Sequence, residues 1–295
     1  ASKEIRILVQ EDLMNDTAKR EIASILRCDG SLIISEFEMQ LLQETYKIDS
    51  NLLFYLPILF EPIDARVQQN WPTYETRKHF VFIGNFLHEP NVNAVQYLKK
   101  DIWPLIRKAV PTAALHIYGA YPSQKIFSLH KPQQGFYVLG RTESSKEILE
   151  NARVCLAPLR FGAGLKGKLL ESMICGTPSV TTTIGAEGIP GAIDWPGMIA
   201  DDPKEFANAA VQLYEDNNLW KAKQQSGVQI IHSRFSKNIF ENEFIKYFNR
   251  LKNNLTAHRL QNFTGAMLMQ QTTLASKYMS KWIESKNKIK HIGGT

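Results

Sequence analysis

The chain has 295 residues, of which 44% are hydrophobic and 22% are charged, as in ordinary soluble globular proteins. This composition excludes a collagen, a mainly disordered chain and a disulfide scaffold. The formal net charge of +6, from 35 basic and 29 acidic side chains, is too small to indicate a nucleic-acid partner. At roughly 150 residues per domain, the length suggests about two domains.

The three cysteines Cys28, Cys155 and Cys175 are far apart and form no CxxC pair. We therefore expect reduced, buried thiols in a cytoplasmic protein, with neither a zinc site nor a redox pair. No apolar run reaches the ~18 residues of a membrane span, and the first residues lack the apolar core of a signal peptide. The seven histidines form no ligand pair at helical spacing, so the sequence predicts no bound metal.

The first 77 residues predict part of an α/β lobe followed by a linker. Apolar periodicity predicts helix, strand, helix and strand in turn, over residues 13–27, 32–34, 37–46 and 52–56. This unit is too small to be a domain by itself. Residues 57–78 hold three prolines and many polar residues, which is typical of a linker between domains.

A longer alternation of strands and helices follows in residues 78–235. Strands are predicted at 80–84, 114–118, 136–139, 154–159, 179–182 and 198–200. Helices are predicted at 93–110, 144–151, 167–175, 203–216 and 218–231, with a glycine-rich loop at 184–191. Apolar strands that alternate with helices indicate a parallel sheet covered on both faces. Such sheets bind ligands at the carboxyl ends of their strands, and glycines stand there at positions 84, 119, 140 and 162.

The densest motif is the segment 162–168, Gly-Ala-Gly-Leu-Lys-Gly-Lys, between a predicted strand and a predicted helix. Glycines let the backbone approach a ligand closely, and a helix N-terminus offers free N–H groups and a positive dipole end. Lys166 and Lys168 add full positive charge. The segment therefore predicts a site for a diphosphate.

Two common nucleotide motifs fit this segment only in part. Gly162, Gly164 and Gly167 match GxGxxG, and Glu187 follows about 20 residues later, but the dinucleotide motif normally opens the first βα unit of its domain. The GxxxxGK spacing of a Walker A loop is also present, but Leu169 stands where that loop needs Ser or Thr.

A third hypothesis is a sugar-nucleotide site. Glu171 lies one helical turn beyond Lys168, so both side chains face the same side of the predicted helix. A carboxylate there can accept both ribose hydroxyls while the lysine holds the diphosphate. The structural alternative is a tight turn that carries a solvated pair of lysines.

Residues from about 80 to 235 resemble the donor-binding domain of GT-B glycosyltransferases, specifically the retaining group called glycosyl transferases group 1. The likeness rests on segments 82–85 with 90–95, 102–104 with 115–119, 157–168 and 170–180. It implies an α/β fold with a Rossmann-like parallel donor-binding sheet over 78–235, preceded by a partial acceptor-side lobe and linker over 1–77. Helices over 236–295 would pack back on the first lobe.

The resemblance also implies an activity and its residues. Sugar would pass from a nucleotide diphosphate sugar, based on UDP or GDP, to a glycan or lipid-linked acceptor, with retention and without metal, in polysaccharide synthesis. Lys168 and Glu171 are the predicted catalytic residues, at the diphosphate and at the ribose. The predicted donor-binding residues are Gly84, Asn85, Tyr118, Gly119, Arg141, Arg160, Gly162, Gly164, Lys166, Gly167, Lys168 and Glu171.

The sequence departs from the family pattern at two positions. Ala163 stands where the family often places a glutamate that contacts the donor sugar, and Asn85 stands where a basic residue is common. Residues 10–60 resemble only the last part of the family's first lobe. A non-catalytic nucleotide-binding or interaction module is therefore an alternative, and an NAD-binding Rossmann protein is another.

The last 40 residues carry six basic side chains (Arg259, Lys277, Lys281, Lys286, Lys288 and Lys290) and one acid, Glu284. Their net charge of +5 accounts for most of the total of +6. Apolar side chains such as Met267, Tyr278 and Trp282 recur at helical spacing. Such a helix either contacts an anionic membrane surface or packs its apolar face on the first lobe.

Overall fold

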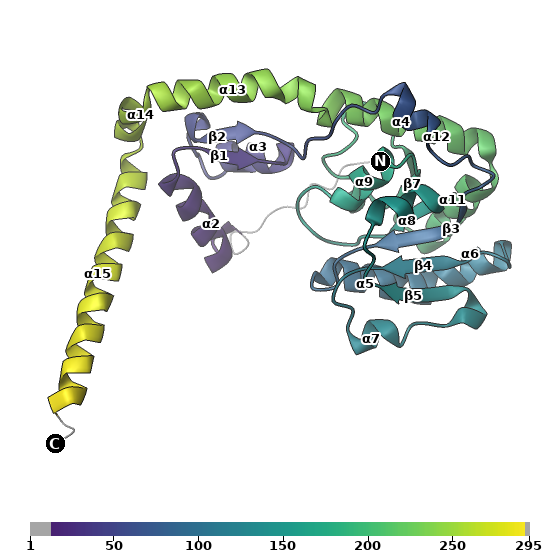
Figure 1. The fold of residues 1–295 in the computed structure, drawn as a ribbon, viewed down its shortest axis with the longest axis horizontal. Helices are drawn as coiled ribbons and strands as arrows, with labels where there is room; N and C mark the ends of the chain where they lie inside the picture. Colours follow the sequence, from purple (N-terminus) through teal and green to yellow (C-terminus); the bar gives the residue numbers. More distant parts are fainter. Residues whose placement is uncertain (1–12, 293–295) are drawn as a thin grey trace. The chain divides into compact units, whose positions relative to one another are not determined.

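The computed structural model describes residues 13–292, which form two compact units (Figure 1). Of the described residues, 13–56 and 242–292 belong to one unit and 57–241 to the larger one. The first division lies before the expected boundary at 77, because the proline-rich segment packs on the larger unit, where Ile63 and Trp71 join a hydrophobic core. The second division lies beyond the expected boundary at 235, inside the helix Lys237–Asn253. Residues 1–12 of the predicted first lobe and the side chains of Lys288 and Lys290 lie outside the described residues.

The larger unit contains a six-stranded parallel sheet in the order β5-β4-β3-β6-β7-β8. The strands are β3 (Lys78–Ile83), β4 (Leu115–Tyr118), β5 (Phe136–Gly140), β6 (Ala152–Ala157), β7 (Ser179–Thr181) and β8 (Gly197–Ile199). The predicted Rossmann-like parallel sheet is confirmed. Strand order reverses between β3 and β6, and open α/β sheets bind ligands at that switch point, beyond the carboxyl ends of the strands.

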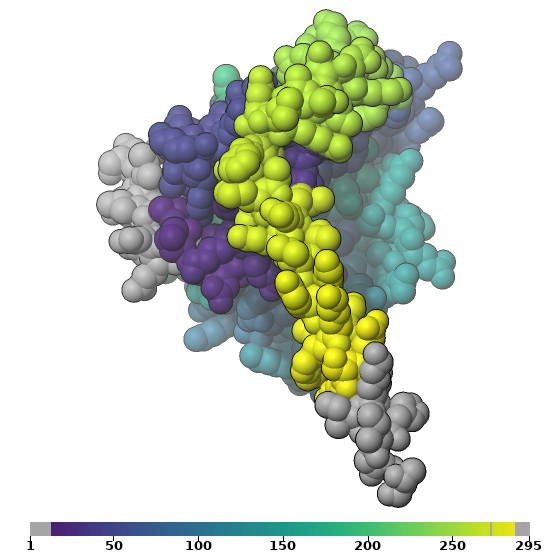
Figure 2. Space-filling view, turned by 90° about the vertical axis from the view of Figure 1, so that its left-hand side faces the viewer, coloured from purple at the N-terminus to yellow at the C-terminus, as the bar shows by residue number. Residues whose placement is uncertain are grey.

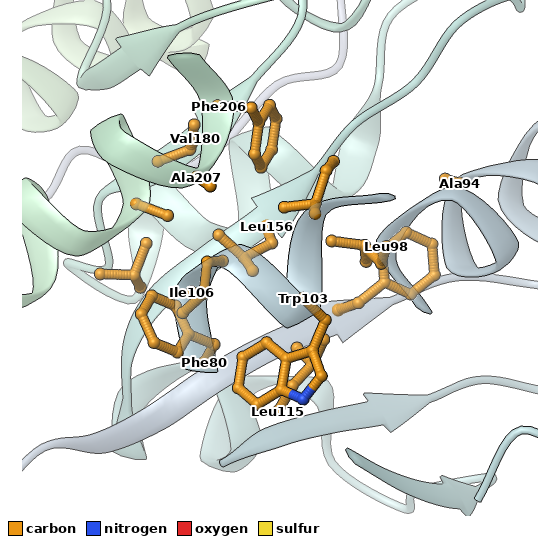
Figure 3. Close-up of a cluster of buried hydrophobic side chains, with 14 of the residues drawn as sticks. Phe80, Ala94, Leu98, Trp103, Ile106, Leu115, Leu156, Val180, Phe206 and Ala207 are labelled. Carbon is orange, nitrogen blue, oxygen red and sulfur yellow. The ribbon is translucent and has the colours of Figure 1, made fainter. Parts of the chain in front are cut away.

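Helices cover both faces of this sheet. On one face lie α5 (Glu89–Tyr97), α6 (Trp103–Ala109) and α11 (Pro203–Glu215), and on the other lie α8 (Ser145–Asn151), α9 (Gly167–Ile174) and α12 (Asn217–Ile230). Successive side chains of β3 point to opposite faces, so Phe80 lies in the core under α5, α6 and α11, and Val81 lies in the core on the face that carries α8. Figure 3 shows the core that contains Phe80, where Trp103 and Leu115 lie close to it.

The helix predicted at 93–110 begins earlier and is not uniform. It starts at Glu89, because a proline at position 90 suits the first turn of a helix. A π-helical segment, Leu98–Ile102, separates α5 from α6, directly before Pro104, which has no backbone N–H to donate.

Three short helices lie in segments where the sequence predicts no helix. They are α4 (Ala65–Gln69), α7 (Gln124–Phe127) and α10 (Thr183–Ala186), the last within the predicted glycine-rich loop. A helix of four or five residues shows too little periodicity to be recognised. Side-chain caps were the available signal for two of them, at Asp64 and Thr182.

The smaller unit begins with α2 (Asp16–Arg27), β1 (Ser31–Ile33), α3 (Glu36–Glu44) and β2 (Leu53–Tyr55), with β1 and β2 paired in parallel. It ends with α13 (Lys237–Asn253), which starts in the larger unit, α14 (Leu255–Gln261) and α15 (Phe263–Ile292). The C-terminal helices pack on the first elements: Tyr247 stacks 4.7 Å from Phe54, and Arg259 pairs with Asp29 at 2.7 Å. No helix among residues 13–292 combines the length and apolar character that a membrane span needs.

The expectation of three buried thiols is wrong for Cys28, which caps the C-terminus of α2 at the surface. Cys155 and Cys175 are buried, and burial raises the pKa of each to about 12. Both therefore remain protonated thiols in the folded protein at neutral pH.

A stacked histidine pair predicts pH-dependent stability. The rings of His79 and His116 lie 4.0 Å apart on β3 and β4, and burial is the main cause that lowers the pKa of His79 to about 4. The unfolded chain takes up a proton near pH 6.5, so stability is lost as pH falls from there toward 4. His79 has a φ of 45°, which asparagine tolerates. In the His79→Asn variant, the free energy of unfolding measured with urea should fall less between pH 7 and 4.5 than in the wild type. We expect the difference to be only about 1–2 kcal/mol, because solvent partly screens the histidine ring. An unchanged loss would contradict this expectation.

Candidate functional site

A cleft of about 380 Å³ opens at the carboxyl ends of the strands beside the switch point. Its lining residues come from the ends of β3, β4 and β5 and from the starts of α5, α8 and α9. They are Ile83, Gly84, Asn85, Asn91, Gly119, Ala120, Arg141, Thr142, Ser145, Lys168 and Glu171. All belong to the larger unit.

The floor of the cleft is made of main chain at Gly84 and Gly119. A Cβ atom at Gly119 would lie 1.9 Å from the carbonyl oxygen of Gly84, so no side chain fits there. A Cβ atom at Gly84 would lie 2.8 Å from Cγ of Asn91 and 2.9 Å from Nζ of Lys168. Glycine at these two positions lets the strand ends approach each other and leaves room for the lysine head group.

The two glycines predict different mutant phenotypes. Gly119→Ala places its methyl group against the backbone of β3, so we expect a loss of about 1–3 kcal/mol in stability, seen as a lower melting temperature. Gly84→Ala meets only side-chain atoms, which can move, so we expect a smaller loss of stability but a displaced Lys168. Equal melting temperatures for the two variants would contradict this difference.

Lys168 places a cation at this floor. Its Nζ donates to Oδ1 of Asn91 at 2.5 Å and lies 4.4 Å from the centroid of the Phe82 ring. Burial lowers the pKa of Lys168 to about 8, although Cys155 and Glu171 oppose that shift. Within the described part of the chain, no carboxylate pairs with this ammonium. A partly buried cation without an anionic partner favours an anionic ligand.

Two further charged side chains line the cleft. Glu171 is exposed and lies one turn beyond Lys168 on α9. Arg141 is exposed and follows Gly140, whose φ of 75° ends β5. The N-terminus of α9 has no side-chain cap, so its first N–H groups are open to another acceptor. The arrangement offers cationic and N–H groups for a diphosphate and a carboxylate for hydroxyl groups.

The structure brings together half of the predicted binding residues. Gly84, Asn85, Gly119, Arg141, Lys168 and Glu171 line the cleft, whereas Tyr118, Arg160, Gly162, Gly164, Lys166 and Gly167 do not.

The basic side chains outside the cleft have structural partners. Lys166 is buried, and its Nζ donates to the carbonyl oxygens of Gly162 at 3.0 Å and Gly164 at 2.7 Å, so it closes the glycine loop on itself. Arg160 donates to Oδ1 of Asn93 at 2.9 Å and lies over the ring of Tyr97. Because of these bonds, the charged groups of Lys166 and Arg160 do not lie in the cleft.

The loop glycines serve the backbone conformation. Gly162 and Gly164 have φ angles of 129° and 72°, in the region that L side chains rarely adopt. Gly167 is the first residue of α9, and Tyr118 packs with the core around Val81 on the face of the sheet that carries α8.

Sequence reasoning missed Ile83, Asn91, Ala120, Thr142 and Ser145 as lining residues. Asn91 is the most informative of them, because it is one of the few buried polar side chains and contacts Lys168 directly. The available signal was its place in the 90–95 segment, which already carried the family resemblance.

Comparison with known proteins finds a family model that is similar to this segment. Residues 77–216 match the family model described as Glycosyl transferases group 1. The match contains every residue that lines the cleft. The cleft therefore lies within the segment that is similar to this family, as the sequence resemblance predicts.

Individual relatives agree with this match. A glycosyltransferase of Methanocaldococcus jannaschii, described as uncharacterized, is 29% identical over 125 residues, which are 40% of this chain and 31% of the relative. A mutant of TarM from S. aureus, in complex with fondaparinux, alpha-GlcNAc-glycerol and UDP, gives a TM-score of 0.64 at 18% identity, over 80% of this chain and 48% of that one. The pneumococcal O-GlcNAc transferase GtfA, in complex with UDP and GlcNAc, gives 0.62 at 17% identity, with coverages of 80% and 48%.

Sucrose-phosphate synthase from Thermosynechococcus elongatus gives a TM-score of 0.60 at 18% identity, over 84% of this chain and 64% of that one. At these identities the likeness establishes the fold, and the predicted GT-B type is confirmed. The chain spans less than half the length of TarM and GtfA and about a third of the curated relative.

Proposed function

We propose that this chain carries the donor site of a glycosyltransferase, which moves a sugar from a nucleotide diphosphate sugar to a glycan or lipid-linked acceptor. The observation that carries the proposal is Lys168, which forms no ion pair with any described carboxylate and lies on the glycine floor of a cleft within the matched segment. UDP in the TarM and GtfA complexes supports a uridine nucleotide as the first donor to test.

In this proposal each residue has a chemical task. The departing diphosphate gains negative charge in the transition state, and Lys168 with the uncapped N-terminus of α9 stabilises that charge. Glu171 accepts the ribose hydroxyls, and Arg141, which also lines the cleft, contacts the base. The family resemblance implies three further properties. The anomeric configuration is retained, a lysine takes the role of a metal ion, and the protein acts in the cytoplasm in polysaccharide synthesis.

Nucleotide binding is the direct test. We expect UDP or GDP and their sugars to raise the melting temperature of the chain, and uridine to have a much weaker effect. Transfer to an acceptor, or slow hydrolysis of the donor, establishes an enzyme, whereas binding without turnover supports a non-catalytic nucleotide-binding module. Enhanced NADH fluorescence with no response to nucleotide sugars would instead support a dinucleotide site.

We also propose that α15 contacts an anionic membrane surface. Leu274, Tyr278 and Trp282 recur every fourth residue on one side of this helix and are 40%, 64% and 57% exposed (Figure 2, yellow). Lys277, Lys281 and Lys286 lie beside them, against the single acid Glu284. Exposed aromatic side chains next to lysines fit the headgroup region of an anionic bilayer, where both apolar burial and charge are favourable.

Vesicle sedimentation tests this contact. We expect the chain to sediment with phosphatidylglycerol vesicles but weakly with phosphatidylcholine vesicles, and Trp282→Glu to reduce the bound fraction several-fold. Lys204→Glu is the control, because it also adds a negative side chain at an exposed helical position, on α11. Equal binding to both lipids would contradict the proposal, as would a dimer in light scattering that Trp282→Glu dissolves.

A further inference from the structure

The side chain of Asn91 joins two parts of the cleft that are far apart in sequence. It lies in the first turn of α5, is 9% exposed, and has both ends of its amide bonded. Nδ2 donates to the carbonyl oxygen of Asn85 at 2.7 Å, just after β3. Oδ1 accepts from Nζ of Lys168 at 2.5 Å, on α9. The amide therefore links the end of β3 to the lysine through one side chain.

These contacts fix where the lysine charge lies. The bond to the Asn85 carbonyl orients the amide so that its oxygen, and not its NH₂ group, faces Lys168. The other close neighbour of the ammonium is the Phe82 ring, which attracts a cation but does not fix its direction. Gly84 provides the space beside it.

We infer that Asn91 is the positioning residue for Lys168, and that its amide holds the ammonium at the cleft floor, where the diphosphate of the donor would lie. The inference rests on the proposed function. A neutral acceptor suits this task, because it orients the cation and leaves its charge for the ligand. A carboxylate at the same position would pair with the ammonium and repel the diphosphate.

A purely structural role for Asn91 accounts for only one of its two bonds. An anchor for the loop after β3 needs the bond from Nδ2 to the Asn85 carbonyl. It does not need the contact between Oδ1 and a lysine that is 77 positions away in the sequence. The two roles therefore predict different behaviour for a variant that keeps the size of the side chain and changes its charge.

The pH profile of UDP binding measures the state of Lys168. The groups that face its ammonium are Cys155 on β6, Glu171 on α9, Phe82 on β3 and Asn91 on α5. We expect wild-type affinity to fall as pH rises through the pKa of Lys168, because the neutral amine no longer attracts phosphate. In Asn91→Asp the carboxylate favours the protonated lysine, so the midpoint of this fall should move up by about one pH unit or more.

The affinity itself provides a second readout. We expect Asn91→Asp to raise the Kd for UDP at pH 7 by about 10-fold or more, and Asn91→Ala to raise it by a smaller factor. Asn93→Asp is the matched control, because it introduces the same charge on the same helix, where its side chain meets Arg160. We expect its midpoint to equal that of the wild type.

The outcomes separate this inference from the proposed function. If wild-type protein binds no nucleoside diphosphate, the proposed function fails. If wild type binds UDP but both Asn91 variants keep the wild-type Kd and midpoint while their melting temperatures fall, Asn91 is structural and the inference is overturned. If Asn91→Asp does not fold, the Asn91→Ala affinity decides, since an unchanged Kd in that variant overturns the inference.

Discussion

Replacing Lys168 by methionine is expected to raise the Kd for UDP by about 10- to 100-fold. A hydrogen bond between a charged donor and a phosphate contributes about 1.5–3 kcal/mol, and the variant removes the ammonium that would make it. Methionine keeps an unbranched apolar stem beside Phe82, so the local packing is preserved. Isothermal titration at pH 7 measures the effect.

A comparison of UDP with uridine shows whether the loss of affinity in Lys168→Met comes from the phosphate groups. Uridine has no phosphate, so its weak affinity should be the same in wild type and in Lys168→Met. Lys204→Met is the control for net charge, because this lysine is exposed on α11. An unchanged Kd for UDP in Lys168→Met would exclude this lysine from the phosphate site, whatever other nucleotide contacts remained.

The largest expected effect on stability belongs to Arg77, which lies just before β3 and is 0% exposed. Its guanidinium donates to the carbonyl oxygens of Pro72, Leu149, Ala152 and Cys175 and to Oγ1 of Thr177. Burial lowers the pKa of Arg77 to about 10, so it remains charged at neutral pH. In Arg77→Met these buried acceptors lose their donor, and we expect a loss of about 3–5 kcal/mol.

Thermal unfolding measures this loss, which should appear as a fall of roughly 10 °C in the melting temperature. Arg77→Lys should restore little of the lost stability, because one ammonium group cannot reach all the acceptors that surround the planar guanidinium of Arg77. The exposed Arg66 on α4 provides the control, where Arg66→Met should change stability by less than about 0.5 kcal/mol. A melting temperature for Arg77→Met close to that of this control would contradict the expectation.

Much of the sheet was predictable because its strands are continuously apolar. Phe80–Ile83 is buried on both sides, and a run of this kind favours a parallel strand whatever surrounds it. The glycines at the ends of β3 and β4 were likewise predicted to lie at the ligand-binding edge of the sheet, and the structure shows the backbone contact that requires Gly119. The spacing of Lys168 and Glu171 on one helix placed both in one cleft.

The role of each basic side chain could not be predicted in the same way. Lys166 and Lys168 are two residues apart in one loop, and only the folded chain shows that Lys166 bonds the carbonyls of its own loop while Lys168 reaches Asn91. Asn91 itself was missed because its contact joins α5 to α9, and no local pattern encodes the distance between two helices. The packing of residues 57–77 on the larger unit is tertiary information of the same kind.

Under the proposed function, the glycine floor of the cleft has a consequence for how donor preference can change during evolution. At Gly119 any substitution meets the main chain of β3, so this part of the cleft has almost no freedom to vary. Asn85, Arg141 and Thr142 line the same cleft with side chains that solvent reaches, and their replacement leaves the hydrophobic cores untouched. Selection for a new base or sugar therefore has few positions to act on, and a combinatorial library at these three residues is a compact way to search for altered donor use.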